Sequence, residues 1–274
     1  TQLKNATLFI TGASSGIGAA TARDAARQGA HVILTARREE ALARVAQEIR
    51  DAGGTAHVYP ADLTDPVAVT RLCDAIRRDH GCPDVIVNNA GAGPWRYLDE
   101  SSPEEVQRMM AAPYLAAAWI SRAFLPDMLE RNAGHLVTLT SVAAHFTWPG
   151  ATAYTAARWA MRGLHEALTA DLASTKIRTT LATFAKVDSS YFETNACSEE
   201  RVPGAQSMIR VLKPEQAARA IVRGVRRNRR HVVAPFGLRL ILWNFWLFPG
   251  ITRWLMRLTG HRRPALPATT RTEP

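Results

Sequence analysis

Short apolar runs alternate with longer amphipathic segments along most of the chain. The runs are rich in Val, Ile and Leu and end at polar or glycine-containing turns, which is typical of buried strands. They comprise Thr7–Ile10, His31–Thr35, His57–Tyr59, Asp84–Asn88, His135–Thr140, Thr179–Thr183 and His231–Ala234. The segments between them predict helices that begin near residues 18, 39, 67, 104, 154 and 216. This alternation predicts an α/β fold with a parallel sheet, right-handed crossovers and helices on both faces.

The first turn, Thr11–Gly18, has the spacing G-x-x-x-G-x-G between a predicted strand and a predicted helix. Gly12 allows a tight turn, Gly16 lets the backbone approach a pyrophosphate, and Gly18 lets the helix pack close to the strand. The helix N-terminus adds free N–H groups and a partial positive charge. We therefore expect a Rossmann-like, doubly wound domain that binds a nucleotide here. The residues expected to line its phosphates are Gly12, Ser14, Ser15, Gly16, Ile17 and Gly18.

Two polar strand ends indicate where an adenosine would bind. The second run leads into Ala36-Arg37-Arg38, which offers no carboxylate to the ribose hydroxyls but two guanidinium groups to a 2′-phosphate. This favours NADP(H) over NAD(H), although the arginines also suit the solvated start of the next helix. Asp62 follows the third run, where its carboxylate suits either an adenine amino group or a helix cap. Asp65-Pro66 is sufficient by itself to cap that helix.

The composition is that of a globular protein. The chain has 274 residues, of which 47% are hydrophobic and 21% charged, enough for one α/β domain with a sizeable core. Cys73, Cys82 and Cys197 have neither disulfide nor metal-ligand spacing, so no metal site is expected. No secretory signal or transit peptide is visible. We expect a cytoplasmic protein with reduced thiols.

The basic charge is concentrated in the last quarter of the chain. Residues 201–274 contain 15 lysines and arginines against 2 acidic residues, a net charge of +13, whereas residues 1–200 contain 19 against 22, a net charge of −3. We divide the chain into a Rossmann-like domain, 1–235, and an apolar, arginine-rich extension, 236–274. No recognition module for nucleic acid is evident, so no nucleic acid partner is expected.

The extension allows two interpretations. Tryptophan and arginine within 236–260 suit peripheral contact with an anionic membrane, and the same segment suits a lid over a substrate pocket or a dimer contact. The apolar run is too short to span a bilayer, and Pro249 interrupts it. Residues 264–274 are predicted to be disordered.

Three motifs together resemble the short-chain dehydrogenase/reductase family, in its branch of shorter chains. They are Thr11–Gly18, Asp62-Leu63 and Asn88-Asn89-Ala90-Gly91, and the resemblance extends over roughly residues 5–235. It implies that the Asn-Asn-Ala-Gly motif stabilises the central sheet and lines the cofactor, and that the loop after the sixth strand contacts the nicotinamide. The cofactor-binding residues that it implies are Asp62, Leu63, Asn89, Ala90, Gly91, Tyr154, Arg158, Val187 and Ser189.

The resemblance also implies an acid–base site. Ser141 precedes Tyr154 by 13 residues, which is the family's catalytic spacing, and Arg158 stands where the family has lysine. Residues i and i+4 share one helix face, which places the cation beneath the phenol. A free tyrosine has a pKa of about 10, and a cation about 4 Å away stabilises its phenolate by about 4 kcal/mol at an effective dielectric of 20. We expect Tyr154 as acid/base, Ser141 as the partner of the substrate oxygen and Arg158 as the cation that also holds the ribose.

Three positions depart from the family pattern. Pro113 stands where the family has an asparagine that holds a helix kink and a relay water, Arg158 replaces lysine, and Phe184-Ala185 replaces Pro-Gly. Two functions therefore stay open. One is an NADP(H)-dependent carbonyl reductase or alcohol dehydrogenase for a hydrophobic substrate. The other is a non-redox enzyme of the same fold, for isomerisation, cyclisation or elimination, or a catalytically degenerate cofactor-binding protein.

Two further expectations concern the surroundings of the site. Residues 190–212 lack periodicity and fall where the family has its substrate loop, so Tyr191, Phe192 and Met208 are candidates for an apolar pocket. Residues 104–130 predict one long helix with a kink at Pro113. The resemblance further implies a homo-oligomer formed through the long helices.

Overall fold

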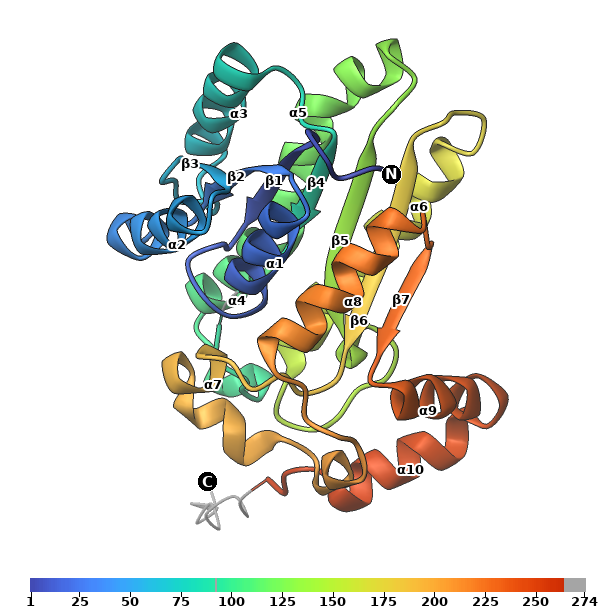
Figure 1. The fold of residues 1–274 in the computed structure, drawn as a ribbon. Coiled ribbons are helices and arrows are strands. Elements are labelled where there is room, and N and C mark those ends of the chain that lie inside the picture. Colours follow the sequence, from blue (N-terminus) through green and yellow to red (C-terminus); the bar gives the residue numbers. More distant parts are fainter. Residues whose placement is uncertain (92, 264–274) are drawn as a thin grey trace, which may run out of the picture.

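Figure 1 shows the computed structural model, which describes residues 1–91 and 93–263; the predicted disorder of 264–274 falls outside them. Seven parallel strands form one sheet in the order β3-β2-β1-β4-β5-β6-β7. They are β1 (Thr7–Thr11), β2 (His31–Thr35), β3 (Thr55–Val58), β4 (Val85–Asn88), β5 (His135–Ser141), β6 (Arg178–Phe184) and β7 (His231–Ala234). The helices are α1 (Gly16–Arg27), α2 (Glu39–Asp51), α3 (Pro66–His80), α4 (Pro103–Met110), α5 (Ala116–Glu130), α6 (Thr152–Asp171), α7 (Tyr191–Thr194), α8 (Pro214–Arg226), α9 (Phe236–Leu247) and α10 (Pro249–Thr259). The predicted Rossmann-like α/β fold is confirmed.

The sheet separates two helical layers, each with its own hydrophobic core. α1, α2 and α8 cover one face and pack alanines and branched apolar side chains against the strands. α3 and α5 cover the other face, where Phe124 packs edge-on against Phe9 with ring centroids 6.2 Å apart. Side chains alternate between the faces, so Leu8 and Ile10 enter the first core and Phe9 the second. Burial on both faces explains why the strands are continuous apolar runs in the sequence.

The strand order reverses between β1 and β4, whose crossovers lead to opposite edges of the sheet. The carboxyl ends of the strands point toward the lower part of Figure 1, where α7, α9 and α10 lie. Ligands of open α/β sheets bind at the carboxyl ends, beside such a switch point. The fold therefore directs attention to this lower edge.

The single long helix predicted over 104–130 is wrong in one respect. α4 ends at Met110, Ala111–Leu115 forms a π-helical turn, and α5 continues from Ala116. Pro113 lies buried in that turn, where its ring excludes a regular bond to the carbonyl four residues earlier. The wider π turn accommodates the ring, so the expected kink takes the form of a local change of helix type.

The described chain ends in two antiparallel helices, α9 and α10, which we call the C-terminal hairpin (236–259). α9 contacts β7, and α10 contacts the short 3₁₀ segment Gly204–Met208. Leu238 and Met256 anchor the hairpin in an apolar cluster that also contains Phe146 and Tyr154. Within the described residues, no helix has both the length and the apolar character needed to cross a membrane.

Candidate functional site

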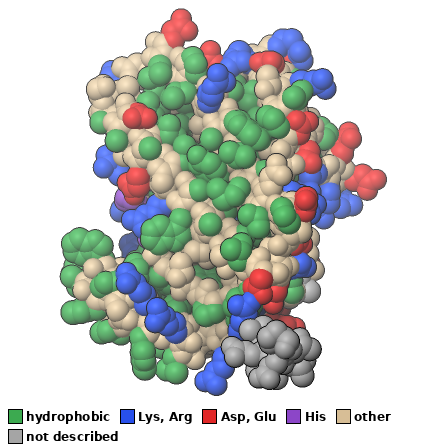
Figure 2. All heavy atoms as spheres, turned by 180° about the vertical axis from the view of Figure 1, so that it is seen from behind, with side chains coloured by type: hydrophobic (Ala, Val, Ile, Leu, Met, Phe, Trp, Pro, Cys, Tyr) green, Lys and Arg blue, Asp and Glu red, His purple; other side chains and the backbone are tan. Residues whose placement is uncertain are grey.

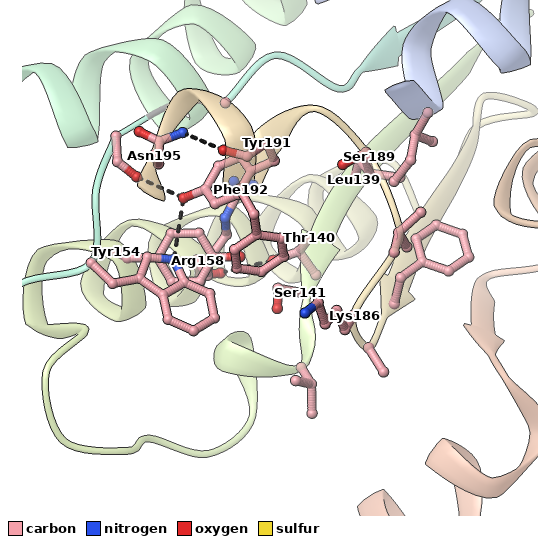
Figure 3. Close-up of a pocket in the computed structure, with 18 of the residues that line it drawn as sticks. Leu139, Thr140, Ser141, Tyr154, Arg158, Lys186, Ser189, Tyr191, Phe192 and Asn195 are labelled. Carbon is pink, nitrogen blue, oxygen red and sulfur yellow. Dashed lines mark hydrogen bonds between the residues drawn. The ribbon is translucent and has the colours of Figure 1, made fainter. Parts of the chain in front are cut away.

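A cavity of about 1160 Å³ opens at the carboxyl ends of the strands (Figure 3). It runs from the glycine turn before α1, past the ends of β5 and β6, to the inner side of the C-terminal hairpin. The predicted site residues that line it are Gly12, Ser14, Ser15, Gly16, Ile17, Arg37, Arg38, Asp62, Leu63, Asn89, Ala90, Gly91, Ser141, Tyr154, Arg158, Val187 and Ser189. Gly18 does not line the cavity but packs beneath the turn. A Cβ at Gly18 would come within 2.3 Å of the Gly12 carbonyl oxygen, so only glycine fits there.

The glycine turn has a backbone that only glycine adopts readily. Gly12 has a φ of +66° and Gly16 a φ of +55°, in the left-handed region that side chains with a Cβ rarely occupy. Ser15 is the N-cap of α1, and in the described part of the chain its side chain makes no capping hydrogen bond. The first N–H groups of α1 are thereby left for a ligand at the cavity wall, an arrangement that suits phosphate.

Thr11 and Asn89 tie this turn to the end of β4. The Thr11 hydroxyl donates to the Val87 carbonyl at 3.3 Å and accepts from the backbone N–H groups of Asn89 and Ala90, each at 2.9 Å. The Asn89 amide donates back to the carbonyls of Thr11 and Gly12, at 2.8 and 3.2 Å. These bonds cross-link β1 and β4 at the switch point. The sequence pointed to Asn89, but not to Thr11 as its counterpart.

The two arginines predicted for a 2′-phosphate lie exposed at the rim of the cavity. The Nη2 atom of Arg38 is 3.4 Å from the hydroxyl of Ser15, which brings this guanidinium beside the glycine turn. Arg37 is close enough to Asp62 to affect its ionisation. The rim next to the turn is therefore cationic.

Asp62 lines the cavity and does not cap α3. Its carboxylate accepts from the backbone N–H and the hydroxyl of Thr64, at 3.0 and 2.8 Å. Burial alone raises the pKa of Asp62, but these bonds and the charge of Arg37 outweigh it and hold the pKa below its usual value. Asp65 caps α3 by accepting from the N–H of Val67 at 2.8 Å. Of the two interpretations of Asp62, the helix cap is thus wrong.

Tyr154 and Arg158 lie one turn apart on α6, with exposed fractions of only 7% and 8%. The guanidinium carbon of Arg158 lies 4.8 Å from the centroid of the Tyr154 ring (Figure 3). The sequence predicted a cation beneath the phenol; in the structure the planar guanidinium contacts the ring face, as a cation–π pair. Among the described residues, the buried Nε of Arg158 has no hydrogen-bond partner. A buried donor is costly to leave unpaired.

Gly91 provides the space that this guanidinium occupies. A Cβ at Gly91 would lie 2.6 Å from Nη2 and 3.3 Å from Nη1 of Arg158. From the other side, the Thr140 hydroxyl at the end of β5 donates to the Arg158 backbone carbonyl at 3.3 Å. The last residue of the Asn-Asn-Ala-Gly motif and the arginine on α6 therefore fit each other sterically.

Ser141 ends β5 with its side chain on the cavity wall (Figure 3). Its hydroxyl oxygen accepts from the N–H of Ala143 at 3.3 Å, which uses a lone pair and not the hydroxyl proton. Phe184 pairs with Ser141 across the sheet and is 2% exposed. The pairing of β5 and β6 thus continues through Phe184, where the family pattern has proline. Proline has no backbone N–H to donate to such a pairing.

A second, partly buried tyrosine faces Tyr154, with 6.3 Å between the ring centroids. The Tyr191 hydroxyl donates to the Gly93 carbonyl at 2.6 Å and accepts from Nε1 of Trp95 at 3.2 Å. Burial, reinforced by the neighbouring Tyr154, raises the pKa of Tyr191 above its usual value, so this phenol stays neutral. Trp95 also packs against Tyr154 at 5.1 Å. Sequence reasoning missed Trp95, whose only signal is a large aromatic residue soon after a strand end.

Apolar side chains line the cavity beyond Tyr154. The three residues predicted for a substrate pocket, Tyr191, Phe192 and Met208, are among them. The C-terminal hairpin supplies a further wall, made of Leu240, Ile241, Asn244, Ile251, Thr252, Leu255 and Met256. The inner side of the hairpin thus has the position of a lid over the apolar end of the cavity.

A separate group of potential metal ligands lies near the amino end of β7. His165, Glu166 and His231 can bring one ligand atom each within 4.8 Å of one another. Burial, with His231 and Arg230 nearby, lowers the pKa of His165 to about 4. Arg162 and Arg230 add positive charge around His231, which disfavours a divalent cation. We assign no metal to this group.

Comparison with known proteins identifies the family of the chain. Residues 6–199 match the family described as short chain dehydrogenase. An uncharacterized oxidoreductase of Mycobacterium tuberculosis is 36% identical over 240 residues, which cover 86% of this chain and 68% of the relative. The 17-beta-hydroxysteroid dehydrogenase 13 of Mus musculus is 31% identical over 239 residues, which cover 86% of this chain and 76% of that protein.

Solved structures show the same fold. A short-chain dehydrogenase/reductase of Burkholderia phymatum in complex with NAD superposes with a TM-score of 0.81 at 24% identity, covering 97% of this chain and 100% of the other. A metagenomic short-chain oxidoreductase in complex with NADP has a TM-score of 0.68 at 32% identity, covering 81% and 90%. The sequence motifs, the sheet order, the Ser141–Tyr154 spacing and these matches agree. The chain therefore belongs to the short-chain dehydrogenase family of oxidoreductases.

Proposed function

We propose that this protein exchanges a hydride and a proton between NADP(H) and the carbonyl or alcohol group of a hydrophobic substrate. The observation that carries the proposal is the contact between Tyr154 and Arg158 inside the cavity that begins at the glycine turn. The apolar wall beyond Tyr154 supports a hydrophobic substrate. The NADP in the metagenomic relative supports a nicotinamide dinucleotide as the cofactor.

The residues of the cavity suit such a cofactor. The positive φ angles of Gly12 and Gly16 and the free start of α1 suit a pyrophosphate. Arg158 lines the cavity, and its guanidinium suits a ribose hydroxyl because it offers only donors. A Cβ at Gly16 would come within 3.3 Å of the Ser189 Cβ, so the turn and the nicotinamide loop face each other closely. When bound, the cofactor would supply or accept the hydride.

The chain's own residues handle the proton. Tyr154 exchanges it with the substrate oxygen, and the permanent charge of Arg158 stabilises the negative charge that develops on the phenol oxygen. The Ser141 hydroxyl donates to the same substrate oxygen and stabilises the charge that develops there. Tyr191 stays a neutral neighbour whose hydroxyl is taken up by its bonds to Gly93 and Trp95.

Replacement of the proposed acid/base tests this role. We expect Tyr154→Phe to lower kcat by about 10² to 10⁴-fold, the usual range for general acid–base catalysis, without weakening NADPH binding. Turnover is measured from the nicotinamide absorbance with a panel of hydrophobic ketones and alcohols, and binding by fluorescence titration. Tyr59→Phe is the matched control, because its hydroxyl bonds Asp79 and His80 away from the cavity. Turnover retained by Tyr154→Phe would exclude the role.

The cofactor preference rests on the cationic rim. Arg37 and Arg38 can form charge-assisted bonds to a 2′-phosphate, each worth roughly 1.5–3 kcal/mol. We therefore expect Arg38→Ala to weaken NADPH binding by about 10 to 100-fold and to leave NADH binding nearly unchanged. Fluorescence titrations with both cofactors measure this. An equal loss for the two cofactors would contradict a contact with the 2′-phosphate.

A non-redox function of the same site is the second candidate. The stacked position of Arg158 and the continuous ladder at Phe184 favour it, because both alter the reacting end of the site. Turnover of a substrate with no change in nicotinamide absorbance, abolished by Tyr154→Phe, would favour this candidate over the first.

A further inference from the structure

The C-terminal hairpin has two apolar sides, and only one of them faces the protein. Its inner side lines the cavity, as described above. Its outer side exposes seven large apolar residues with exposed fractions between 48% and 80%: Phe236, Trp243, Trp246, Leu247, Phe248, Trp254 and Leu258. We call these seven residues the outer patch. Figure 2 shows the protruding hydrophobic side chains at the lower left, where the hairpin lies after the half-turn from Figure 1.

α9 lacks the polar face of an ordinary surface helix. Leu238 is fully buried, yet Trp243 and Trp246 on the outward side are 70% and 80% exposed. A helix that is apolar all round is normally buried on all sides. α10 follows the same plan on a smaller scale, with Thr252 and Met256 buried and Trp254 exposed. The outer patch therefore lacks the apolar environment that such surfaces have in their functional state.

The hairpin that carries the outer patch has charges of one sign. Residues 236–259 contain three arginines, at positions 239, 253 and 257, and no aspartate or glutamate. Of the two arginines that follow, Arg263 pairs with Asp99. The side chains of Arg253 and Arg257 are exposed and lie on the same short helix as Trp254. Tryptophan beside arginine suits the interface of a bilayer, where the indole ring lies among the head groups and arginine pairs with anionic lipid.

We propose that the outer patch docks the protein on the surface of an anionic lipid bilayer. The hairpin lies in the interface plane and does not span the membrane, in agreement with the lengths of α9 and α10. The proposal stands without the proposed function, since binding is independent of catalysis. If the proposed function also holds, docking brings the apolar end of the cavity next to a phase that dissolves hydrophobic substrates.

Charge decides between a bilayer and a second copy of the chain. A symmetric contact through the outer patch would bring the three arginines of one hairpin against the three of the other, with no carboxylate in 236–259 to pair with them. An anionic bilayer presents the opposite charge. The same feature that disfavours self-association therefore favours lipid.

Sedimentation of the full chain with vesicles tests the proposal. We expect the protein to bind vesicles of phosphatidylcholine with about 30% phosphatidylglycerol at least 10-fold more tightly than vesicles of phosphatidylcholine alone. Added salt should weaken this binding. The triple variant Trp243→Ser/Trp246→Ser/Trp254→Ser should lose at least 10-fold in apparent affinity. Trp159→Ser, which removes a tryptophan that is 46% exposed on α6, should bind like the unchanged protein.

A second pair of variants separates local from overall charge. Arg253→Glu/Arg257→Glu should weaken binding, whereas Arg223→Glu/Arg226→Glu, with the same change of net charge on α8, should have a much smaller effect. Equal loss in both double variants would mean that overall charge alone acts, and would overturn docking through the hairpin. Absence of binding to the anionic vesicles would also overturn it. If that protein formed a concentration-dependent dimer that the triple variant abolished, the outer patch would be a contact between two copies of the chain instead.

Discussion

One of the three departures from the family pattern, Arg158, contacts the proposed acid/base directly. Arg158 replaces a compact ammonium group with a longer planar head, and that head lies against the Tyr154 ring and in the space left by Gly91. Its charge is permanent, so electrostatic support of the phenol does not depend on a proton. Its position, however, depends on a gap that one methyl group would close. The charge beside Tyr154 is therefore fixed, but the position of that charge depends on the space at Gly91.

Gly91→Ala tests that dependence. The new Cβ would lie 2.6 Å from Nη2 of Arg158, so the guanidinium must move, and a displacement of about 1 Å can cost about 10²-fold in rate. We expect a loss of about 10²-fold in kcat/KM, with the fold retained. Thermal unfolding and steady-state turnover measure both quantities. Restoration of activity by adding Arg158→Lys, whose head is smaller, would assign the loss to this contact.

Gly163→Ala is the control for that substitution. Gly163 lies exposed in α6, and the space that a Cβ would occupy there is open. Alanine there avoids any clash and favours the helix. Activity should stay near that of the unchanged protein. A comparable loss of activity in both glycine variants would show that the effect of Gly91→Ala is not specific to Arg158.

At the scale of the elements, the sequence predicts the sheet well because both of its faces are buried. Continuous apolar runs leave little ambiguity about where β1, β4 and β5 lie, and the glycine turn marks the start of α1. These features depend on local sequence. They suffice to gather nearly all the predicted cofactor residues, from Gly12 to Ser189, around one cavity.

The elements that sequence could not predict depend on long-range contacts. The π turn at Pro113 depends on how the packed helix accommodates the proline ring, and the pattern of apolar residues does not predict that. Trp95 reaches Tyr154 only because the loop after β4 folds over the site, where the N–H of Trp95 donates to the Ser198 hydroxyl at 2.8 Å. The two sides of the hairpin were visible only as one apolar segment, because α9 has no polar stripe to distinguish them.

At the scale of the whole molecule, the net positive charge lies in one part of the chain and the buried histidines lie in another. The positive charge gathers in the last quarter of the chain, whereas several histidines lie inside the fold as neutral groups. His135 is fully buried at the start of β5 and bonds the hydroxyls of Thr1 and Thr180 at 2.9 and 2.7 Å. Burial is the main cause that lowers the pKa of His135 to about 3 and that of His145 and His165 to about 4.

These buried histidines predict how stability depends on pH. The pKa of each lies below the unfolded value of about 6.5, so between pH 6.5 and 4 the unfolded chain binds protons that the folded chain does not. Stability is therefore complete above pH 6.5 and falls as the pH drops. From pH 7.5 to 5, linkage gives a loss of about 2 kcal/mol in the free energy of unfolding for each histidine.

Urea unfolding of His135→Gln at the two pH values isolates one of these contributions. The variant loses hydrogen bonds at both pH values, so its absolute stability is not the informative quantity. The difference between pH 7.5 and pH 5 should shrink by about 2 kcal/mol relative to the unchanged protein, because glutamine does not titrate. An undiminished difference would mean that His135 takes up its proton without unfolding. Acid sensitivity would then arise elsewhere, and burial at the start of β5 would not be its cause.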